Sequence, residues 1–118
     1  MKNEVLKYLV KRNKMDKEEF KKNFKDTLDN MYNIMERKNS DYTKTSAFWN
    51  FELVEKLWIT SIEKWILVRM ADKMSRISTL IDQDAKVKDE SIADTLQDLA
   101  NYSVILKIYL EYANKNKE

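Results

Sequence analysis

Glu90, Asp94, Asp98 and Asn101 are polar residues that fall on one line of a predicted helix near the carboxyl end. At about 100° per residue, these positions lie within about 40° of a single line along the helix through Asp94. Carboxylates spaced four residues apart on a helix repel each other. We therefore expect positive charges to face this acidic row.

The preceding predicted helix carries such charges. Arg69, Asp72 and Arg76 lie on one flank of it, within about 60° of each other, and Lys73 lies at the border between this flank and the apolar stripe. We expect this flank to face the acidic row of the last helix. The two helices would then bring carboxylates, guanidinium groups and an ammonium group together.

Two interpretations of this arrangement stay open at the level of the residues. The first is a network of structural ion pairs between the helices. The second is a metal-assisted phosphate site, because carboxylate oxygens suit Mg²⁺ and Arg and Lys suit phosphate oxygens. In the second interpretation, the metal ligands are carboxylates from both helices: Asp72, Glu90, Asp94 and Asp98.

A second candidate is the polar segment 38–46, which reads as a loop. Lys38, Asp41 and Tyr42 could contact the sugar, phosphates or base of a nucleotide, but a helix end followed by a turn explains the same residue types. Tyr102, on the shoulder of the last helix, could serve in a core or in a site. The remaining aromatic candidates are expected in a core or an interface rather than in a base-stacking platform: Trp49, Phe51, Trp58 and Trp65.

Apolar periodicity and capping residues predict the elements that hold these side chains. Helices are expected over residues 4–12, from Lys17, over 47–57, over 61–81, and from a cap at Asp89 or a neighbour to Tyr112, with loops at 38–46 and 82–88. The final helix is expected to bury a stripe through its leucines, including Leu96, Leu99 and Leu106. Short links between long helices indicate an all-α bundle of four to five helices in a single domain, 1–118.

Composition excludes several classes of function. The 118 residues contain no Gly, Pro, Cys or His. This excludes zinc fingers, disulfide frameworks, Cys or His nucleophiles, and the Gly-rich phosphate loops. Charge is balanced at +2, without the clustered basic face of a dedicated nucleic-acid binder. No apolar run suits a membrane span and the amino end is too polar for a signal peptide, so we expect a cytoplasmic protein without membrane contact.

Three segments resemble blocks of one family. They are 38–42 (KNSDY), 69–77 (RMADKMSRI) and 89–102 (DESIADTLQDLANY). Their order and spacing resemble the nucleotide modification associated domain (DUF1599-type), a small and often phage-encoded domain that is distantly similar to MazG-type all-α nucleoside triphosphate pyrophosphohydrolases. The resemblance covers residues 31–112 and leaves 1–30 as an amino-terminal helical extension.

The resemblance implies a nucleotide ligand, a homo-oligomer (dimer or tetramer) and, by analogy with the MazG type, Mg²⁺-dependent release of pyrophosphate from a nucleoside triphosphate. Asp94 and Asp98 would then be catalytic, within a metal set completed by Asp72 and Glu90. The implied nucleotide-binding residues come from all three blocks: Lys38, Asp41, Tyr42, Arg69, Lys73, Arg76, Asn101 and Tyr102.

The chain departs from the MazG-type pattern on the earlier helix. That pattern has a Glu-Glu-x-x-Glu cluster there, whereas this chain has Asp72 among basic residues. Glu52 and Glu55 have a Glu-x-x-Glu spacing, but in a shorter, aromatic segment. Fewer carboxylates bind a metal ion more weakly. The alternative function is therefore a non-catalytic accessory or inhibitor protein of a phage that binds a nucleotide or a host protein.

Overall fold

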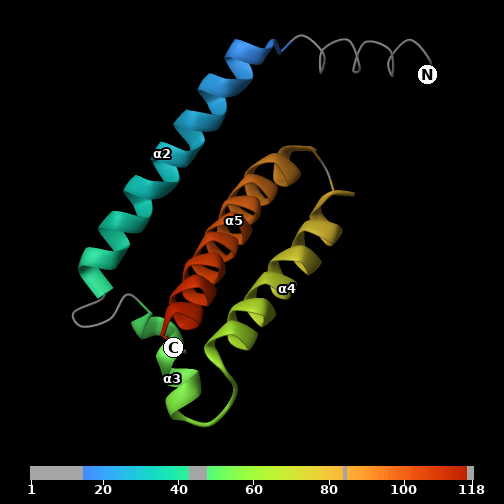
Figure 1. Ribbon diagram of the computed structural model, residues 1–118. Helices are drawn as coiled ribbons and strands as arrows, with labels where there is room; N and C mark the ends of the chain where they lie inside the picture. The colour runs from blue at the N-terminus through green and yellow to red at the C-terminus, as the bar shows by residue number, and fades with distance from the viewer. Residues whose placement is uncertain (1–14, 43–47, 84, 117–118) are drawn as a thin grey trace. The chain divides into compact units, whose positions relative to one another are not determined.

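The computed structural model describes residues 15–42, 48–83 and 85–116, and within these ranges it leaves the side chains at 38–42, 49–50 and 85–91 undescribed. The described residues form four helices and no strand (Figure 1). These helices are α2 (Lys17–Tyr42), α3 (Trp49–Lys56), α4 (Ile62–Leu80) and α5 (Ala85–Lys115). The predicted all-α fold is confirmed. None of the described helices has the length and apolar character needed to cross a membrane.

The chain divides into two compact units, residues 1–42 and 43–118. The helix expected at 4–12 lies outside the described residues, and the single domain stays a prediction. In the first unit, α2 begins at Lys17 as expected, because the Asp16 carboxylate caps it by accepting a hydrogen bond of 2.8 Å from the Glu19 backbone N–H.

The end of α2 differs from the prediction. The helix continues through Tyr42, so the loop expected at 38–46 is wrong over its first five residues. Lys, Asn, Ser and Asp in this stretch weaken a helix only slightly, and neither Gly nor Pro interrupts it. Loss of the apolar pattern therefore does not mark the end of the helix here.

In the second unit, α4 and α5 lie side by side and form the core (Figure 1). The Ser61 hydroxyl caps α4 by accepting a hydrogen bond of 3.4 Å from the Lys64 N–H, close to the predicted start. Ile62 and Ile66 are 4% and 0% exposed, and they are the buried apolar side chains among the described residues of this unit. The core is therefore small and concentrated in the first turns of α4.

Two predictions about α5 are wrong. The helix begins at Ala85, so the expected loop 82–88 is shorter and Asp89 lies inside the helix instead of capping it. The expected leucine stripe is also wrong at Leu96, which is 48% exposed while its neighbour Thr95 is 3% exposed. Leu99 and Leu106 are half-buried. A small Thr side chain lets two helices approach closely, and the line that faces α4 is accordingly displaced toward the acidic row.

The α3–α4 turn contains a residue in an unusual conformation. Trp58 has a φ of 61°, in the left-handed region. Its N–H donates to the Glu55 carbonyl at 3.0 Å, and the Ile59 N–H donates to the Val54 carbonyl at 2.9 Å. This hydrogen-bond pair is the Schellman motif that closes a helix, and its left-handed position normally belongs to Gly. Because the chain has no Gly, a Trp occupies that position, at a cost of about 1–2 kcal/mol.

Aromatic contacts join α3 to the carboxyl end of α5. The Phe48 ring meets the Tyr109 ring edge-on at 5.3 Å between centroids, and the Tyr112 ring at 6.3 Å. Burial raises the pKa of Tyr109 from its ordinary value of 10.0, and the Glu63 and Glu55 carboxylates add to the shift. The neutral phenol is thus the form that the folded unit favours.

The raised pKa of Tyr109 predicts a loss of stability in alkali. A folded-state pKa above the unfolded one adds stability below about pH 10, and that stability is lost as the pH rises through the folded-state pKa. In the Tyr109→Phe variant, the loss of unfolding free energy between about pH 8 and about pH 11 should be smaller than in the wild type. Urea unfolding at the two pH values measures it, with the exposed Tyr32→Phe as control. An unchanged alkaline loss in Tyr109→Phe would contradict the prediction.

Candidate functional site

Two side-chain contacts join α4 to α5 at the predicted site. The Lys73 Nζ lies 3.4 Å from the Asp98 Oδ2, and the Arg69 Nε–H donates to the Tyr102 hydroxyl over 3.5 Å. The two contacts are four residues apart on each helix and run in opposite directions, which is the register of an antiparallel pair. The flank of α4 thus faces the acidic row of α5, as expected from the sequence.

Arg69 occupies the centre of this site. Its guanidinium carbon lies 6.0 Å from the centroid of the Tyr102 ring, and its NH1 lies 3.6 Å from the Asp72 Oδ2. The hydrogen bond with Tyr102 raises the pKa of Arg69, and the carboxylates of Asp72 and Asp98 raise it further. The guanidinium is therefore positively charged at physiological pH.

Phe51 belongs to the site and was not predicted to be there. Its ring meets the Tyr102 ring edge-on, with centroids 6.4 Å apart. Phe51 thereby holds the aromatic ring whose hydroxyl accepts from Arg69. The aromatic character of residues 47–57 indicated that this segment packs against the other helices. Which of its aromatic residues contacts Tyr102 depends on how α3 packs against α5, and the sequence alone does not show this.

The two charges of the interhelical ion pair differ in exposure. The Lys73 side chain is 20% exposed and the Asp98 side chain is 50% exposed. The ammonium group is thus partly withdrawn from water, where a negative partner stabilises it more strongly than at an open surface. A phosphate oxygen could take the place of the Asp98 carboxylate, because both are anionic acceptors.

The other predicted site residues do not take part in these contacts between α4 and α5. Asp94 and Arg76 are exposed, and within the described part of the chain neither has an ion-pair partner. Asn101 is half-buried. The remaining candidates have side chains outside the described residues: Lys38, Asp41, Tyr42 and Glu90.

Two of the carboxylates in the acidic row have the chemistry of metal ligands. Asp94 and Asp98 offer the hard oxygen donors that Mg²⁺ prefers. Over the described side chains, however, no three His, Cys, Asp or Glu residues form a group that could hold a metal ion. Asp72 and Asp98 instead lie beside Arg69 and Lys73, respectively. Two of the four predicted metal ligands, Asp72 and Asp98, therefore already pair with cations in the described part of the site.

Comparison with protein families identifies the domain that contains these residues. The family model described as nucleotide modification associated domain 1 (DUF1599) matches residues 38–110. The chain belongs to this family. The matched range includes both interhelical contacts and Phe51, and lies within the span 31–112 expected from the sequence. No curated protein and no solved structure matches the chain.

Proposed function

We propose that this member of the nucleotide modification associated domain 1 family binds the phosphates of a nucleotide on the face where α4 meets α5. The observation that carries the proposal is the placement of Arg69 and Lys73 beside each other, each with an oxygen acceptor from α5. Arg76 lies one turn beyond Lys73 on the same flank and adds a third cation. Tyr102, whose ring contacts Phe51 and lies 6.0 Å from the Arg69 guanidinium carbon, is an aromatic surface beside this cationic flank.

The finer proposal is Mg²⁺-dependent pyrophosphohydrolase activity in phage-type nucleotide metabolism. Glu90, Asp94 and Asp98 would supply oxygen ligands, and a bound Mg²⁺ would acidify water and screen phosphate charge. In this proposal Arg69 and Lys73 orient the phosphates, and Asp94 and Asp98 act in catalysis. The family resemblance also supports self-association into a dimer or tetramer.

A second candidate function is nucleotide binding without turnover. It is supported by the ion pairs of Asp72 and Asp98, which direct two of the four predicted metal ligands toward cations. In this case Asp98 serves as an intramolecular substitute for phosphate, and a bound nucleotide displaces it from Lys73. The two candidates share the cationic side of the site and differ only in the role of the carboxylates.

A titration of the purified full chain tests the proposal. We expect deoxynucleoside triphosphates to bind at least about tenfold more tightly than monophosphates, because additional phosphate oxygens meet Arg69, Lys73 and Arg76. Calorimetry with and without Mg²⁺ measures binding, and release of pyrophosphate or phosphate reports turnover. Binding with pyrophosphate release supports the enzyme, and binding with no product supports the second candidate. Failure of every nucleotide to bind would leave the contacts as structural ion pairs.

A further inference from the structure

Arg69 uses different nitrogens of its guanidinium group for its two polar contacts. The Nε–H donates to the Tyr102 hydroxyl, and NH1 lies 3.6 Å from the Oδ2 of the exposed Asp72. A guanidinium can meet an anion along the edge that contains the Nε–H or along the edge formed by its two terminal nitrogens. Because the Tyr102 hydroxyl takes the Nε–H, the terminal edge is the one that remains for a phosphate group.

Tyr102 restrains Arg69 in two ways. At 3.5 Å the hydrogen bond alone is weak, but the guanidinium carbon also lies 6.0 Å from the centroid of the Tyr102 ring, within reach of a cation–π contact. The ring is itself half-buried and meets the Phe51 ring edge-on. Asp72, by contrast, has a side chain that is 62% exposed, and an ion pair so open to water contributes little.

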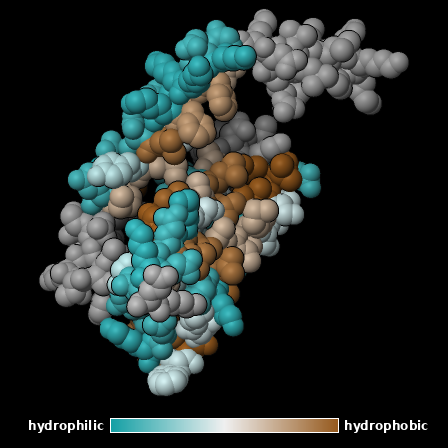
Figure 2. Space-filling model, viewed as in Figure 1, coloured by the Kyte–Doolittle hydropathy of each residue, from teal (hydrophilic) through white to brown (hydrophobic). Residues whose placement is uncertain are grey.

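Few other polar groups are available to Arg69. Its neighbours along α4, Val68 and Met70, are apolar, and apolar side chains reach the surface along both α4 and α5 (Figure 2). Among the described residues, the Tyr102 hydroxyl and the Asp72 carboxylate are the polar side-chain groups in contact with the guanidinium. Without the hydroxyl, the long Arg69 side chain would keep only an exposed partner on its own helix and would regain rotamer freedom.

We propose that Tyr102 is a positioning residue for phosphate binding, whose hydroxyl fixes the plane of the Arg69 guanidinium so that its two terminal nitrogens face a phosphate group. This inference rests on the proposed phosphate site and adds the residue that preorganises one of its cations. An Arg fork that is already held in place binds a phosphate through two parallel hydrogen bonds and loses less conformational entropy. In this role the hydroxyl acts through Arg69, and the ring need not touch the base.

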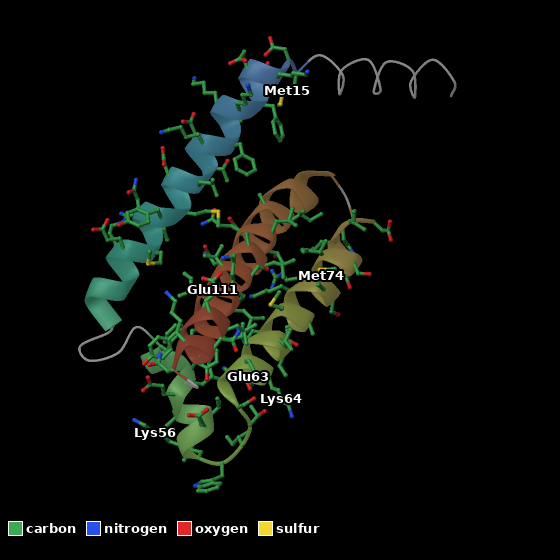
Figure 3. All side chains as sticks on the ribbon, viewed as in Figure 1. Met15, Lys56, Glu63, Lys64, Met74 and Glu111 are labelled. Atoms are coloured by element: carbon green, nitrogen blue, oxygen red, sulfur yellow. The ribbon has the colours of Figure 1, made fainter. Side chains whose placement is uncertain are left out.

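Calorimetric titration of the full chain without Mg²⁺ tests the proposal, with inorganic triphosphate and a deoxynucleoside triphosphate as the two ligands. Tyr102→Phe removes only the hydroxyl and keeps the ring that contacts Phe51. Its affinity for both ligands should fall about fivefold, as expected for the loss of one hydrogen bond. Tyr112→Phe is the matched control, because it removes the same atom about 15 Å farther along α5, directly after Glu111 (Figure 3). It should bind both ligands as the wild type does.

A second background separates positioning of Arg69 from other roles of the hydroxyl. Lys keeps the positive charge but lacks the planar fork that the hydroxyl orients. In a chain that carries Arg69→Lys, adding Tyr102→Phe should therefore cost no further affinity for either ligand. A fivefold loss that persists in this background would give the hydroxyl a role that does not pass through Arg69, and it would overturn the proposal. So would a Tyr102→Leu variant that loses only the deoxynucleoside triphosphate, which would make the ring a stacking surface for the base.

The Arg69 Nε–H provides a readout that needs no ligand. Its nuclear magnetic resonance signal, assigned by its loss in Arg69→Lys, should exchange with water more slowly than that of the exposed Arg76, and Tyr102→Phe should abolish the difference. Equal exchange of the two signals in the wild type overturns the positioning role, as does unchanged triphosphate affinity in Tyr102→Phe. A wild type that binds neither ligand overturns the proposed phosphate site, and the positioning role falls with it.

Discussion

Replacement of Ile66 by Ala is expected to lower the free energy of unfolding by about 3 kcal/mol. Ile66 is 0% exposed, and within the described residues it is the most completely buried side chain. Truncation removes three carbon atoms from the small core of this unit and leaves a cavity that the surrounding side chains fill only in part. For a chain of this size the loss is a large part of the total stability.

Urea unfolding followed by far-ultraviolet circular dichroism measures this effect. Leu67→Ala is the matched control. Leu67 is the next residue of α4 and is 52% exposed, and its replacement by Ala removes the same number of carbon atoms. We expect a loss below about 1 kcal/mol for Leu67→Ala, since half of that side chain is already in water. Equal losses in the two variants would show that α4 does not bury the face that contains Ile66.

The starts of α2 and α4 could be predicted from the sequence because they depend on local capping chemistry. Asp16 followed by Glu19 predicted the start of α2, and the capping hydrogen bond from the Glu19 N–H is present. The start of α4 near Ser61 also agrees with the prediction. A capping side chain and the backbone N–H that it accepts from lie within one turn of each other, so the local sequence is enough to predict the hydrogen bond.

Features that depend on another part of the chain could not be predicted. The expected loops at 38–46 and 82–88 assumed that polar residues end a helix, but α2 runs to Tyr42 and α5 begins at Ala85. The face that α5 buries is centred nearer Thr95 than Leu96 because the contact with α4 sets its rotation. Hydropathy alone would predict that Leu96, which has the larger and more apolar side chain, is buried in place of Thr95.

The sequence predicted which two helices face each other at the candidate site, but it did not predict all of the individual contacts between their side chains. Opposite charges on the two helices predicted that they would face each other, and the contact between Lys73 and Asp98 confirms this. The role of Phe51 depends on how α3 packs against Tyr102, which no local pattern encodes. Asp94 and Asp98 lie in the same acidic row and both are exposed, but within the described residues only Asp98 lies close enough to a cation, Lys73, to form an ion pair.

Replacement of Lys73 by Met should weaken nucleotide binding about 10- to 100-fold if the proposed phosphate site is correct. The Met side chain keeps the apolar stem, which is mostly buried here, and removes only the charged group that would meet a phosphate oxygen. A hydrogen bond to a charged partner contributes about 1.5–3 kcal/mol, which corresponds to that range of affinities. Calorimetric titration with a deoxynucleoside triphosphate at fixed ionic strength measures the change.

Lys107→Met is the matched control, because Lys107 is also an ion-paired lysine, with Glu111, but lies on the exposed surface of α5. It should bind nucleotide as the wild type does, and equal affinity in Lys73→Met would exclude Lys73 from the phosphate site. The Asp94→Asn variant separates binding from chemistry. Without Mg²⁺ it should bind at least as tightly as the wild type, because a negative charge near the phosphates is gone. With Mg²⁺ it should release no pyrophosphate if Asp94 is catalytic, whereas turnover at the wild-type rate would assign catalysis to other residues and leave Asp94 a solvated member of the acidic row.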